Sequence, residues 1–112
     1  MKVHQIFLNN SLRNYNYILY SEIADHAIVF DPYDWQIIEN IEKELKIEIK
    51  LLLNTHDHPD HIRANKEFCS LPGRKKLNLK DGDTYHLSEN EKIICRLTPG
   101  HVSDHLCYFL YE

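Results

Sequence analysis

The apolar residues of this chain follow two different periods, and the change from one to the other divides the sequence into strands and helices. Three short runs rich in β-branched and aromatic residues come first, at Val3–Leu8, Tyr17–Tyr20 and Ala27–Phe30. Such runs, when polar residues separate them, are typical of strands. The pattern therefore predicts that the chain opens with a meander of short strands.

A helical period follows Asp34, a residue of a type favoured at the N-cap. From Trp35 to Leu45 the apolar residues recur every three or four positions, with charged residues between them. This spacing predicts an amphipathic helix that covers the sheet. The next apolar run, Ile49–Leu53, predicts an interior strand that is buried on both faces.

Turn-forming residues divide the second half of the chain into shorter elements. A short helix is expected at Ile62–Phe68 and strands at Lys92–Leu97 and Leu106–Tyr111, the last with its aromatic residues in the core. The segment Lys80-Asp81-Gly82-Asp83 contains Asp-Gly, a strong hairpin signal, so we assign its aspartates to a tight turn and not to a metal site. Together the elements predict an α/β fold.

Length and composition limit the class of protein. A chain of 112 residues can form one domain with one modest core. It has no apolar span long enough to cross a membrane and no apolar secretory signal, so we expect a cytoplasmic protein without membrane contact. Cys69, Cys95 and Cys107 are an odd set, which indicates reduced, mostly buried thiols. The net charge of −4, with basic residues scattered apart from 74–76, argues against nucleic acid as a partner.

Candidate metal ligands follow the interior strand. The stretch Thr55-His56-Asp57-His58-Pro59-Asp60-His61 holds three imidazoles and two carboxylates, donors that zinc accepts. His56 and His58 lie two residues apart, so an extended backbone points both to the same side. Asp60 and His61 follow the turn at proline. One loop can thus present His56 and His58 to a first metal ion, and Asp60 and His61 to a second.

A further candidate ligand lies at the end of a later strand. In Thr98-Pro99-Gly100-His101, proline and glycine shape a turn from which His101 projects. With His56 and His58 it makes a set of three imidazoles, a number that leaves an open position for water or substrate in catalytic zinc sites.

A plainer alternative is that the histidines form a fortuitous cluster of solvated surface residues. The motifs follow predicted strands, which favours the metal site. The other histidines lack that context, and we expect them at surface, strand or outer packing positions: His4, His26, His86 and His105.

These motifs resemble those of a known family. His56-Asp57-His58-Pro59-Asp60-His61 has the His-x-His-x-Asp-His form of the metallo-β-lactamase superfamily, and Thr98-Pro99-Gly100-His101 is similar to its next metal motif. Within the superfamily the chain most resembles glyoxalase II, the hydroxyacylglutathione hydrolases, through residues 14–19, 27–32 and 98–109. The resemblance implies an incomplete αβ/βα sandwich, made of the N-terminal half and the start of the second sheet.

The resemblance also implies that part of the domain is missing. In the family a later strand supplies an aspartate that bridges two metal ions, and a later histidine completes the second site. Because this chain ends at Glu112, we expect residues 1–112 to be one C-terminally truncated domain. An exposed sheet edge should result, and because such edges pair with other chains, either a homodimer through that edge or aggregation is expected.

The function implied by the resemblance is zinc-dependent hydrolysis of a small-molecule thioester such as S-lactoylglutathione. One or two zinc ions, or alternatively iron or manganese, would be held by His56, His58, Asp60, His61 and His101. Asp60 is also the expected catalytic residue, as an orienting group or proton acceptor for the attacking water. The alternative is a degenerate metal-binding or interaction fragment without catalytic activity.

One departure from the family pattern lies beside the metal loop. Where the family usually has small residues before an asparagine, this chain has Ile62 and Arg63 before Asn65. We expect the two larger side chains to narrow access to the loop or to alter the packing of the following helix.

Overall fold

The computed structural model describes residues 1–7, 15–55, 62–98 and 106–112. In chain order the elements of these segments are β1 (Lys2–Phe7), β2 (Tyr15–Tyr20), β3 (Ala27–Phe30), α1 (Trp35–Leu45), β4 (Ile49–Leu53), α3 (Asn65–Cys69), β5 (Lys75–Lys76), β6 (Thr84–Ser88), β7 (Glu91–Leu97) and β8 (Leu106–Tyr111).

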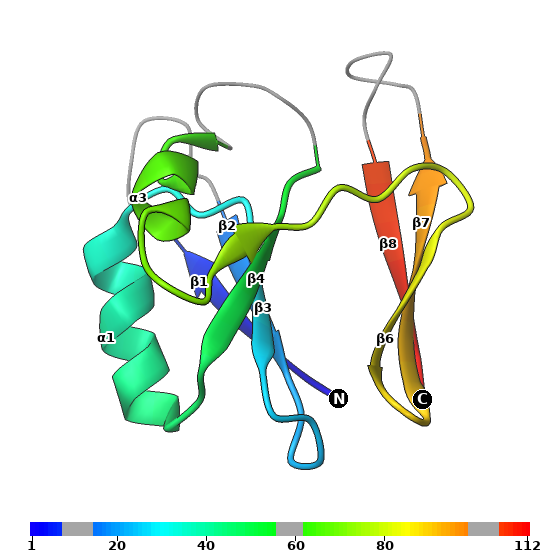
Figure 1. The fold of residues 1–112 in the computed structure, drawn as a ribbon, viewed down its shortest axis with the longest axis horizontal. Coiled ribbons are helices and arrows are strands. Elements are labelled where there is room, and N and C mark those ends of the chain that lie inside the picture. Colours follow the sequence, from blue (N-terminus) through cyan, green and yellow to red (C-terminus); the bar gives the residue numbers. More distant parts are fainter. Residues whose placement is uncertain (8–14, 56–61, 99–105) are drawn as a thin grey trace.

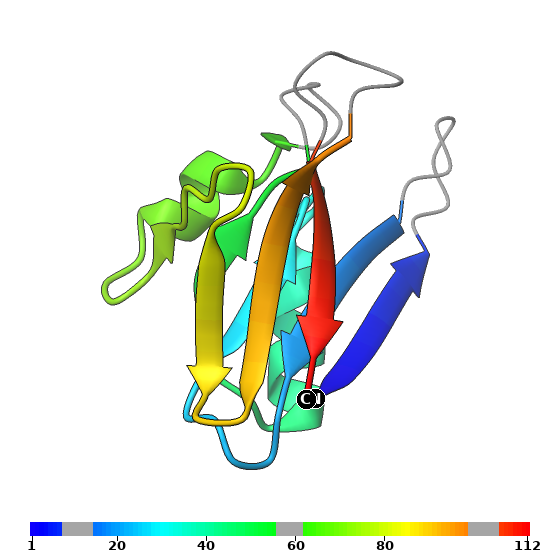
Figure 2. The same ribbon diagram turned by 90° about the vertical axis from the view of Figure 1, so that its right-hand side faces the viewer.

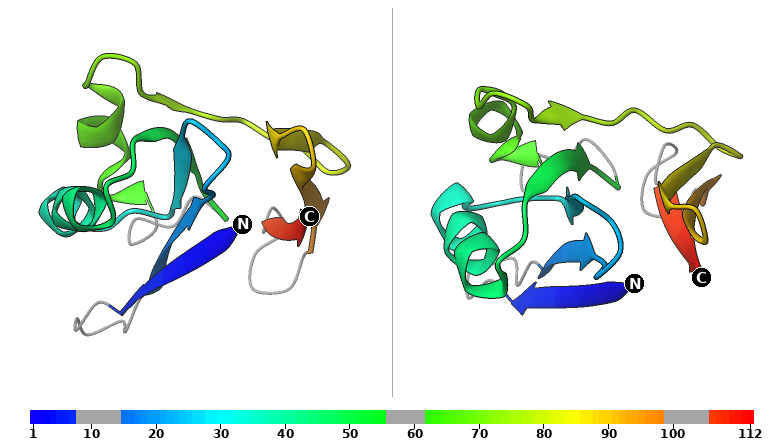
Figure 3. Two further views of the ribbon diagram at one scale, coloured as in Figure 1. Left: turned by 90° about the horizontal axis from the view of Figure 1, so that it is seen from below. Right: turned by 60° about the horizontal axis from the view of Figure 1, so that its bottom comes forward.

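These elements are arranged in three layers (Figure 1). The central layer is a five-stranded sheet in the order β1-β2-β3-β4-β5, antiparallel from β1 to β3 and parallel from β3 to β5. The helices α1 and α3 cover one face of it, and the antiparallel sheet β6-β7-β8 lies against the other; Figure 3 shows the layers from two further directions. The architecture agrees with the expected α/β sandwich. None of the helices in the described segments is long and apolar enough to span a membrane.

Apolar side chains fill both faces of the central sheet. Because alternate residues of a strand point to opposite faces, β2 sends Ile18 into the core under the helices and Leu19 into the core between the sheets. All four residues of β3 are buried, which fits a strand with neighbours and covering layers on both sides. In β4 every residue except half-buried Lys50 is buried, so the prediction of an interior strand at Ile49–Leu53 is confirmed.

Two predictions of local structure are also confirmed. Asp34 caps α1, since its side chain accepts a hydrogen bond from the Gln36 amide at 3.0 Å. Asp83 belongs to a turn, because its Oδ2 accepts a hydrogen bond from the Lys80 amide at 2.9 Å, and Gly82 has a φ of 90°. Glycine adopts this conformation without steric cost.

The short helix and the last strand of the central sheet differ from expectation. The helix α3 begins at Asn65 and not at Ile62, because the Ala64 amide donates to the Pro32 carbonyl at 3.1 Å and thereby ties the segment to the end of β3. The pattern predicted no strand at β5, whose two residues are both lysines. This strand pairs in parallel with β4 through backbone groups, which requires no apolar side chain.

The prediction that the aromatic residues of β8 lie in the core is wrong for two of them. Tyr108 packs against Phe30 with ring centroids 5.4 Å apart, but Phe109 and Tyr111 are 49% and 46% exposed. Alternation along the strand places Phe109 and Tyr111, paired with Ile94 and Lys92 of β7, on the outer face of the three-stranded sheet. No layer covers that face in the described part of the chain (Figure 1).

Arg74 joins α1 to the segment between α3 and β5. Its Nη2 donates to both carboxylate oxygens of Glu42, at 2.8 and 3.0 Å, and its Cζ lies 4.6 Å from the centroid of the Trp35 ring. Glu42 also accepts a hydrogen bond from the Ile49 amide at 2.7 Å. The two charged side chains are only 15% and 12% exposed. At this depth each charge depends on its partner for stabilisation.

We expect Arg74→Ala to lower the free energy of unfolding by about 3 kcal/mol, because it leaves the Glu42 carboxylate buried without its cation. Urea denaturation followed by Trp35 fluorescence measures the loss. A matched control is Lys43→Ala, which removes an exposed pair with Glu39 at 3.2 Å and should cost less than about 0.5 kcal/mol. Equal losses in both variants would contradict a special role for Arg74.

Glu91 links the two sheets. Its side chain is 8% exposed, and its Oε1 accepts hydrogen bonds from Ser21 after β2 and from Ser88 at the end of β6, both at 2.7 Å. Burial by itself raises the pKa of Glu91, but the Ser88 and Ser21 hydroxyls and the amino-terminal ammonium outweigh it, so the pKa lies below its ordinary value.

This contact should make stability depend on pH in the acid range. A carboxylate with a lowered folded-state pKa stabilises the fold above its unfolded pKa, and that contribution is lost as the pH falls through the folded pKa. We therefore expect the free energy of unfolding to fall from about pH 5 to about pH 3, and to fall less steeply in Glu91→Gln. Urea denaturation across this range tests it, with the exposed Glu89→Gln as control. If the free energy of unfolding falls equally steeply with pH in the wild type and in Glu91→Gln, the Glu91 contact is not a source of the pH dependence.

Candidate metal centre

The predicted ligands lie on two segments whose ends the structure describes. His56, His58, Asp60, His61 and His101, together with His105, fall outside the described residues. Thr55 comes directly before the first of these segments, and Leu106 comes directly after the second. The position of Thr55 therefore shows where the first segment starts, and the position of Leu106 shows where the second segment ends.

A hydrogen bond joins these two ends. The Leu106 amide donates to the Thr55 carbonyl at 2.7 Å, although Leu106 begins a strand of the second sheet and Thr55 follows a strand of the central sheet. Figure 1 shows the end of β4 and the start of β8 at the same edge of the molecule. The fold thus brings the ends of both motif-bearing segments to one place.

The carboxylate of Asp31 fixes the end of β4. Its Oδ1 accepts a hydrogen bond from the Thr55 amide at 2.9 Å, and its Oδ2 accepts one from the Thr55 hydroxyl at 2.7 Å. The Asn54 side-chain amide donates to Oδ1 at 3.3 Å. Asp31 is buried, and hydrogen bonds to a buried carboxylate are stronger than those between neutral groups.

The backbone of Asp31 is held as well. Its φ of 52° lies in the left-handed region, which aspartate tolerates better than most residues. The Asp31 amide donates to the Leu53 carbonyl at 3.0 Å, and the buried Asn16 side chain donates to the Asp31 carbonyl. Asn16 also accepts a hydrogen bond from the Tyr33 amide at 3.1 Å. Strands β2, β3 and β4 therefore meet at this one residue.

Two further contacts extend the network to α3 and to the second sheet. Asn54 and Asn65 exchange side-chain hydrogen bonds of 2.6 and 3.4 Å, so the asparagine that matches the family pattern anchors α3 to the end of β4. The Tyr108 hydroxyl donates to the Asn54 carbonyl at 2.6 Å. Burial raises the pKa of the Tyr108 phenol, so it stays a hydrogen-bond donor at neutral pH.

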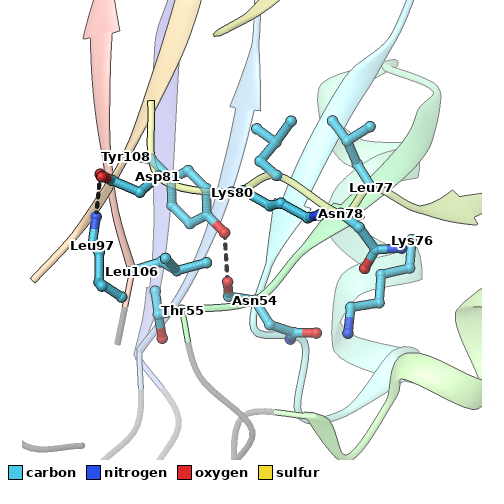
Figure 4. Close-up of a pocket in the computed structure, with 11 residues that line it drawn as sticks. Asn54, Thr55, Lys76, Leu77, Asn78, Lys80, Asp81, Leu97, Leu106 and Tyr108 are labelled. Carbon is cyan, nitrogen blue, oxygen red and sulfur yellow. Dashed lines mark hydrogen bonds between the residues drawn. The ribbon is translucent and has the colours of Figure 1, made fainter. Parts of the chain in front are cut away.

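A cavity of about 360 Å³ lies beside this network (Figure 4). Thr55 and Leu106 line it together with Asn54 and Tyr108, and the segment from Lys76 to Asp81 forms the opposite wall. Lys76 and Lys80 bring positive charge to that wall, and the Asp81 carboxylate accepts a hydrogen bond from the Leu97 amide at 2.9 Å. The cavity is therefore a mostly apolar space with charged side chains on one wall, and it adjoins the ends of both motif segments.

The side chain of Arg63 packs against Tyr33, which lies between β3 and α1. Its Cζ lies 4.4 Å from the ring centroid of Tyr33, a cation–π distance. Ile62 is half-buried. Whether these two side chains narrow access to the metal loop stays a prediction, because the loop itself lies outside the described residues.

The remaining histidines and cysteines lie away from this edge or take no part in it. Among the residues that the structure describes, no group of three or more His, Cys, Asp or Glu side chains gathers as a metal site. His26 lies at the start of β3, with Nδ1 2.7 Å from Asp25 and Nε2 2.7 Å from the Tyr85 hydroxyl. All three cysteines are free, but only Cys95 is buried, so the expectation of mostly buried thiols is wrong for exposed Cys69 and half-buried Cys107.

Reasoning from the sequence missed the supporting residues of this edge. These supporting residues, which are Asp31, Asn54 and Tyr108, do not belong to a metal-ligand motif. Each of them acts through contacts with residues far away in the chain. One signal was available: Asp31 and Asn54 are polar residues directly after the two most apolar strands. Polar residues at the adjacent carboxyl ends of parallel strands often meet at one edge of the sheet.

Comparison with known proteins agrees with this architecture. The sequence model of the Metallo-beta-lactamase superfamily matches residues 12–91. The chain is 35% identical over 125 residues to a hydroxyacylglutathione hydrolase of Francisella tularensis subsp. novicida, across 100% of this chain and 48% of that protein. A hydroxyacylglutathione hydrolase of Francisella philomiragia is 35% identical over 127 residues, with the same coverage. The chain spans about half the length of the curated relatives it matches.

Solved structures share the fold. The structure of ETHE1 from Myxococcus xanthus matches 98% of this chain and 54% of its own, with a TM-score of 0.82 at 24% identity. A metallo-beta-lactamase from Staphylococcus aureus matches 98% of this chain and 38% of its own, with a TM-score of 0.76 at 21% identity. The fold is thus part of a metallo-beta-lactamase sandwich. The chain belongs to the metallo-beta-lactamase superfamily, whose sequence model matches more than half of it.

The Asp31 network predicts an order of stabilities. Asp31→Asn keeps a residue that tolerates positive φ but loses the charge and one acceptor, so we expect a loss of about 1–2 kcal/mol. Asp31→Ala removes every side-chain acceptor and adds backbone strain, so we expect a loss of about 3–4 kcal/mol. Urea denaturation measures both, with the exposed Asp25→Asn as control. A loss in Asp31→Asn and Asp31→Ala no larger than that in Asp25→Asn would show that the carboxylate hydrogen bonds contribute nothing.

Proposed function

We propose that this chain carries the metal-binding part of a zinc-dependent hydrolase that acts on a thioester such as S-lactoylglutathione. The observation that carries the proposal is the hydrogen bond between Thr55 and Leu106, which joins the ends of the two segments that hold the candidate ligands. His56, His58 and His101 would hold a first ion, and Asp60 and His61 a second.

The donor set and its frame fit a zinc site. Imidazole nitrogens and a carboxylate oxygen are common zinc donors, and three protein ligands leave a position open for catalysis. The hydrogen bonds of Asp31 and Tyr108 fix Thr55 and Asn54, directly before the first ligand, in the manner of the outer contacts that orient metal ligands. Iron or manganese stay alternatives, because nitrogen and oxygen donors also suit those metals.

The roles of the residues follow from this arrangement. Zinc, when bound, lowers the pKa of a coordinated water to about 7 and so makes hydroxide available at neutral pH. Asp60 would orient the attacking water or accept its proton. Asp31 restricts Thr55, directly before the segment that contains Asp60, and Leu106 at the start of β8 donates a hydrogen bond to the same residue. Such restraint keeps reacting groups close to a productive geometry.

The choice of substrate is supported by two observations. The relatives that match the whole chain are named hydroxyacylglutathione hydrolases. The cavity beside Thr55 has Lys76 and Lys80 on one wall, which suits a substrate that carries carboxylates. Three free cysteines suit a reducing compartment and support a cytoplasmic location for this activity.

Metal content tests the proposal first. Elemental analysis of untagged protein should find about one or two zinc ions per chain, and removal by a chelator should lower the melting temperature, because a ligand that binds only the folded state stabilises it. His56→Ala and His101→Ala should each lower zinc affinity by more than the roughly 10–100-fold that a change of an outer contact causes. His86→Ala, in an exposed position of β6, is the matched control and should bind zinc like the wild type.

Turnover then separates the proposal from its alternative. Hydrolysis of S-lactoylglutathione that is lost with zinc and restored by zinc supports the hydrolase. Tight zinc binding without turnover of thioesters or esters would instead favour a metal-binding protein without catalytic activity. Wild-type zinc content in His101→Ala would exclude the site of three histidines.

A further inference from the structure

A group of three hydrogen-bonded side chains lies away from the candidate metal centre. His26, directly before β3, has Nδ1 2.7 Å from the Asp25 carboxylate and Nε2 2.7 Å from the hydroxyl of Tyr85 in β6. We call these three residues the His26 group. Figure 1 shows the turn before β3 at one end of the sandwich and the end of β4 at the other. The imidazole is only 15% exposed, and its hydrogen bonds lie outside the network around Asp31.

The Asp25 carboxylate determines where the protons of the His26 group lie. The hydrogen bond from His26 and the positive charge of Lys50 hold the pKa of Asp25 below its ordinary value, so this carboxylate is ionised at neutral pH and can only accept. Nδ1 of His26 therefore carries a proton, and in a neutral imidazole Nε2 is then an acceptor. Burial raises the pKa of the Tyr85 phenol, which stays protonated and donates to Nε2.

A small cavity of about 250 Å³ adjoins the His26 group. All three of its members line the cavity, together with Lys50 of β4 and Lys75 of β5. Figure 2 shows β6 in front of this part of the central sheet. Within the described part of the chain, neither Lys50 nor Lys75 makes an ion pair. Two ammonium groups without a counterion therefore share a small cavity with the Tyr85 phenol.

The charges around the cavity favour an anion over a cation. Lys50 and Lys75 bring two positive charges, whereas Asp25 brings one negative charge that is already bonded to His26. Beyond His26 lies a second cavity, to which two lysines and two glutamates bring charges that balance: Lys2, Lys46, Glu22 and Glu48. A cation would be repelled by both ammonium groups of the small cavity.

We infer that the small cavity binds a tetrahedral oxyanion, a sulfate ion or a phosphate group, when His26 is protonated. A protonated His26 donates from both ring nitrogens, so the Tyr85 oxygen accepts from Nε2 and its own proton turns to the cavity. The phenol then joins Lys50 and Lys75 as a donor to the anion. With neutral His26 the phenol proton points to Nε2, and only the oxygen lone pairs face the cavity, which repels an anion.

Binding of the anion would connect the two sheets. Lys50 and Lys75 belong to the central sheet, and Tyr85 belongs to the second sheet. The inference does not depend on the proposed function, because the cavity and the candidate ligands share no residue. Zinc content and anion binding are measured separately, so the failure of one is distinguishable from the failure of the other.

Sulfate is a suitable probe, because it does not change its own protonation near neutral pH. We expect saturable binding of sulfate to the full chain by isothermal titration calorimetry at constant ionic strength. The affinity should be at least about threefold higher at about pH 6 than at about pH 8, the range in which a histidine ordinarily changes charge. Calorimetry in two buffers of different ionisation enthalpy should also show proton uptake on binding, because a nearby anion favours the charged imidazole.

Variants test the three donors at about pH 6. Lys50→Gln and Lys75→Gln should each weaken sulfate binding by about fivefold or more, because each removes a charged donor. Tyr85→Phe should weaken binding and reduce its pH dependence. The matched controls are Lys66→Gln on α3 and His86→Gln beside Tyr85, both at exposed positions, and each should change the affinity less than about twofold.

Two further measurements locate the bound anion and identify its source. The His26 imidazole carbon resonance of the wild-type chain should move toward its protonated position when sulfate is added. Tighter binding of glycerol 2-phosphate than of sulfate supports a phosphate monoester as the ligand, and the reverse order supports the free inorganic anion.

Three results would overturn the inference. The first is wild-type sulfate affinity in Lys50→Gln and Lys75→Gln, and the second is an affinity that does not change with pH. The third is loss of sulfate binding after zinc is removed with a chelator that is then dialysed away, which would assign the anion to the metal centre.

Discussion

The hydrogen bonds to the Asp31 carboxylate are the constraint on which the metal-motif edge depends. They hold Thr55 and Asn54 at the end of β4, while the backbone of Asp31 ends β3 in a left-handed conformation. Through Asn16 the same residue reaches β2. Buried networks of this kind stabilise a structure when every polar group is paired, and loss of one group leaves its partners buried without a hydrogen bond. The first segment with candidate ligands therefore starts from a frame that is fixed in three strands.

Apolar and polar interactions have different tasks in this fold. The layers are held by two apolar cores, one under the helices and one between the sheets, and neither core specifies where a metal could bind. The parallel pairing of β3 with β4 puts their carboxyl ends at one edge, and the polar residues that follow each strand meet there. The contact between Leu106 and Thr55 then brings the second sheet to the same edge. The position of the candidate site is thus determined by a few buried polar groups on an otherwise apolar scaffold.

How far the sequence predicts this structure depends on the range of the interactions. The cap at Asp34, the helix that follows it and the turn at Asp83 depend on neighbours in the chain, and all three were predictable. The two-residue strand β5 is held by backbone pairing with β4, which leaves no mark on side-chain pattern. Phe109 and Tyr111 look like core residues because alternation tells which residues share a face, but not which face is covered. The candidate ligands themselves rest on spacing and resemblance, and they stay predictions.

Strand β8 connects the second sheet to the candidate metal centre. It supplies Leu106 and Tyr108, which donate hydrogen bonds to the backbone carbonyls of Thr55 and Asn54 at the end of the central sheet. A catalytic zinc site needs ligands held rigidly from several elements. The contacts of Leu106 and Tyr108 therefore fix the second sheet to the end of β4, directly before the first candidate ligands. Because the Tyr108 ring also packs against Phe30 of β3, the same strand takes part both in the core between the sheets and in the frame of the candidate site.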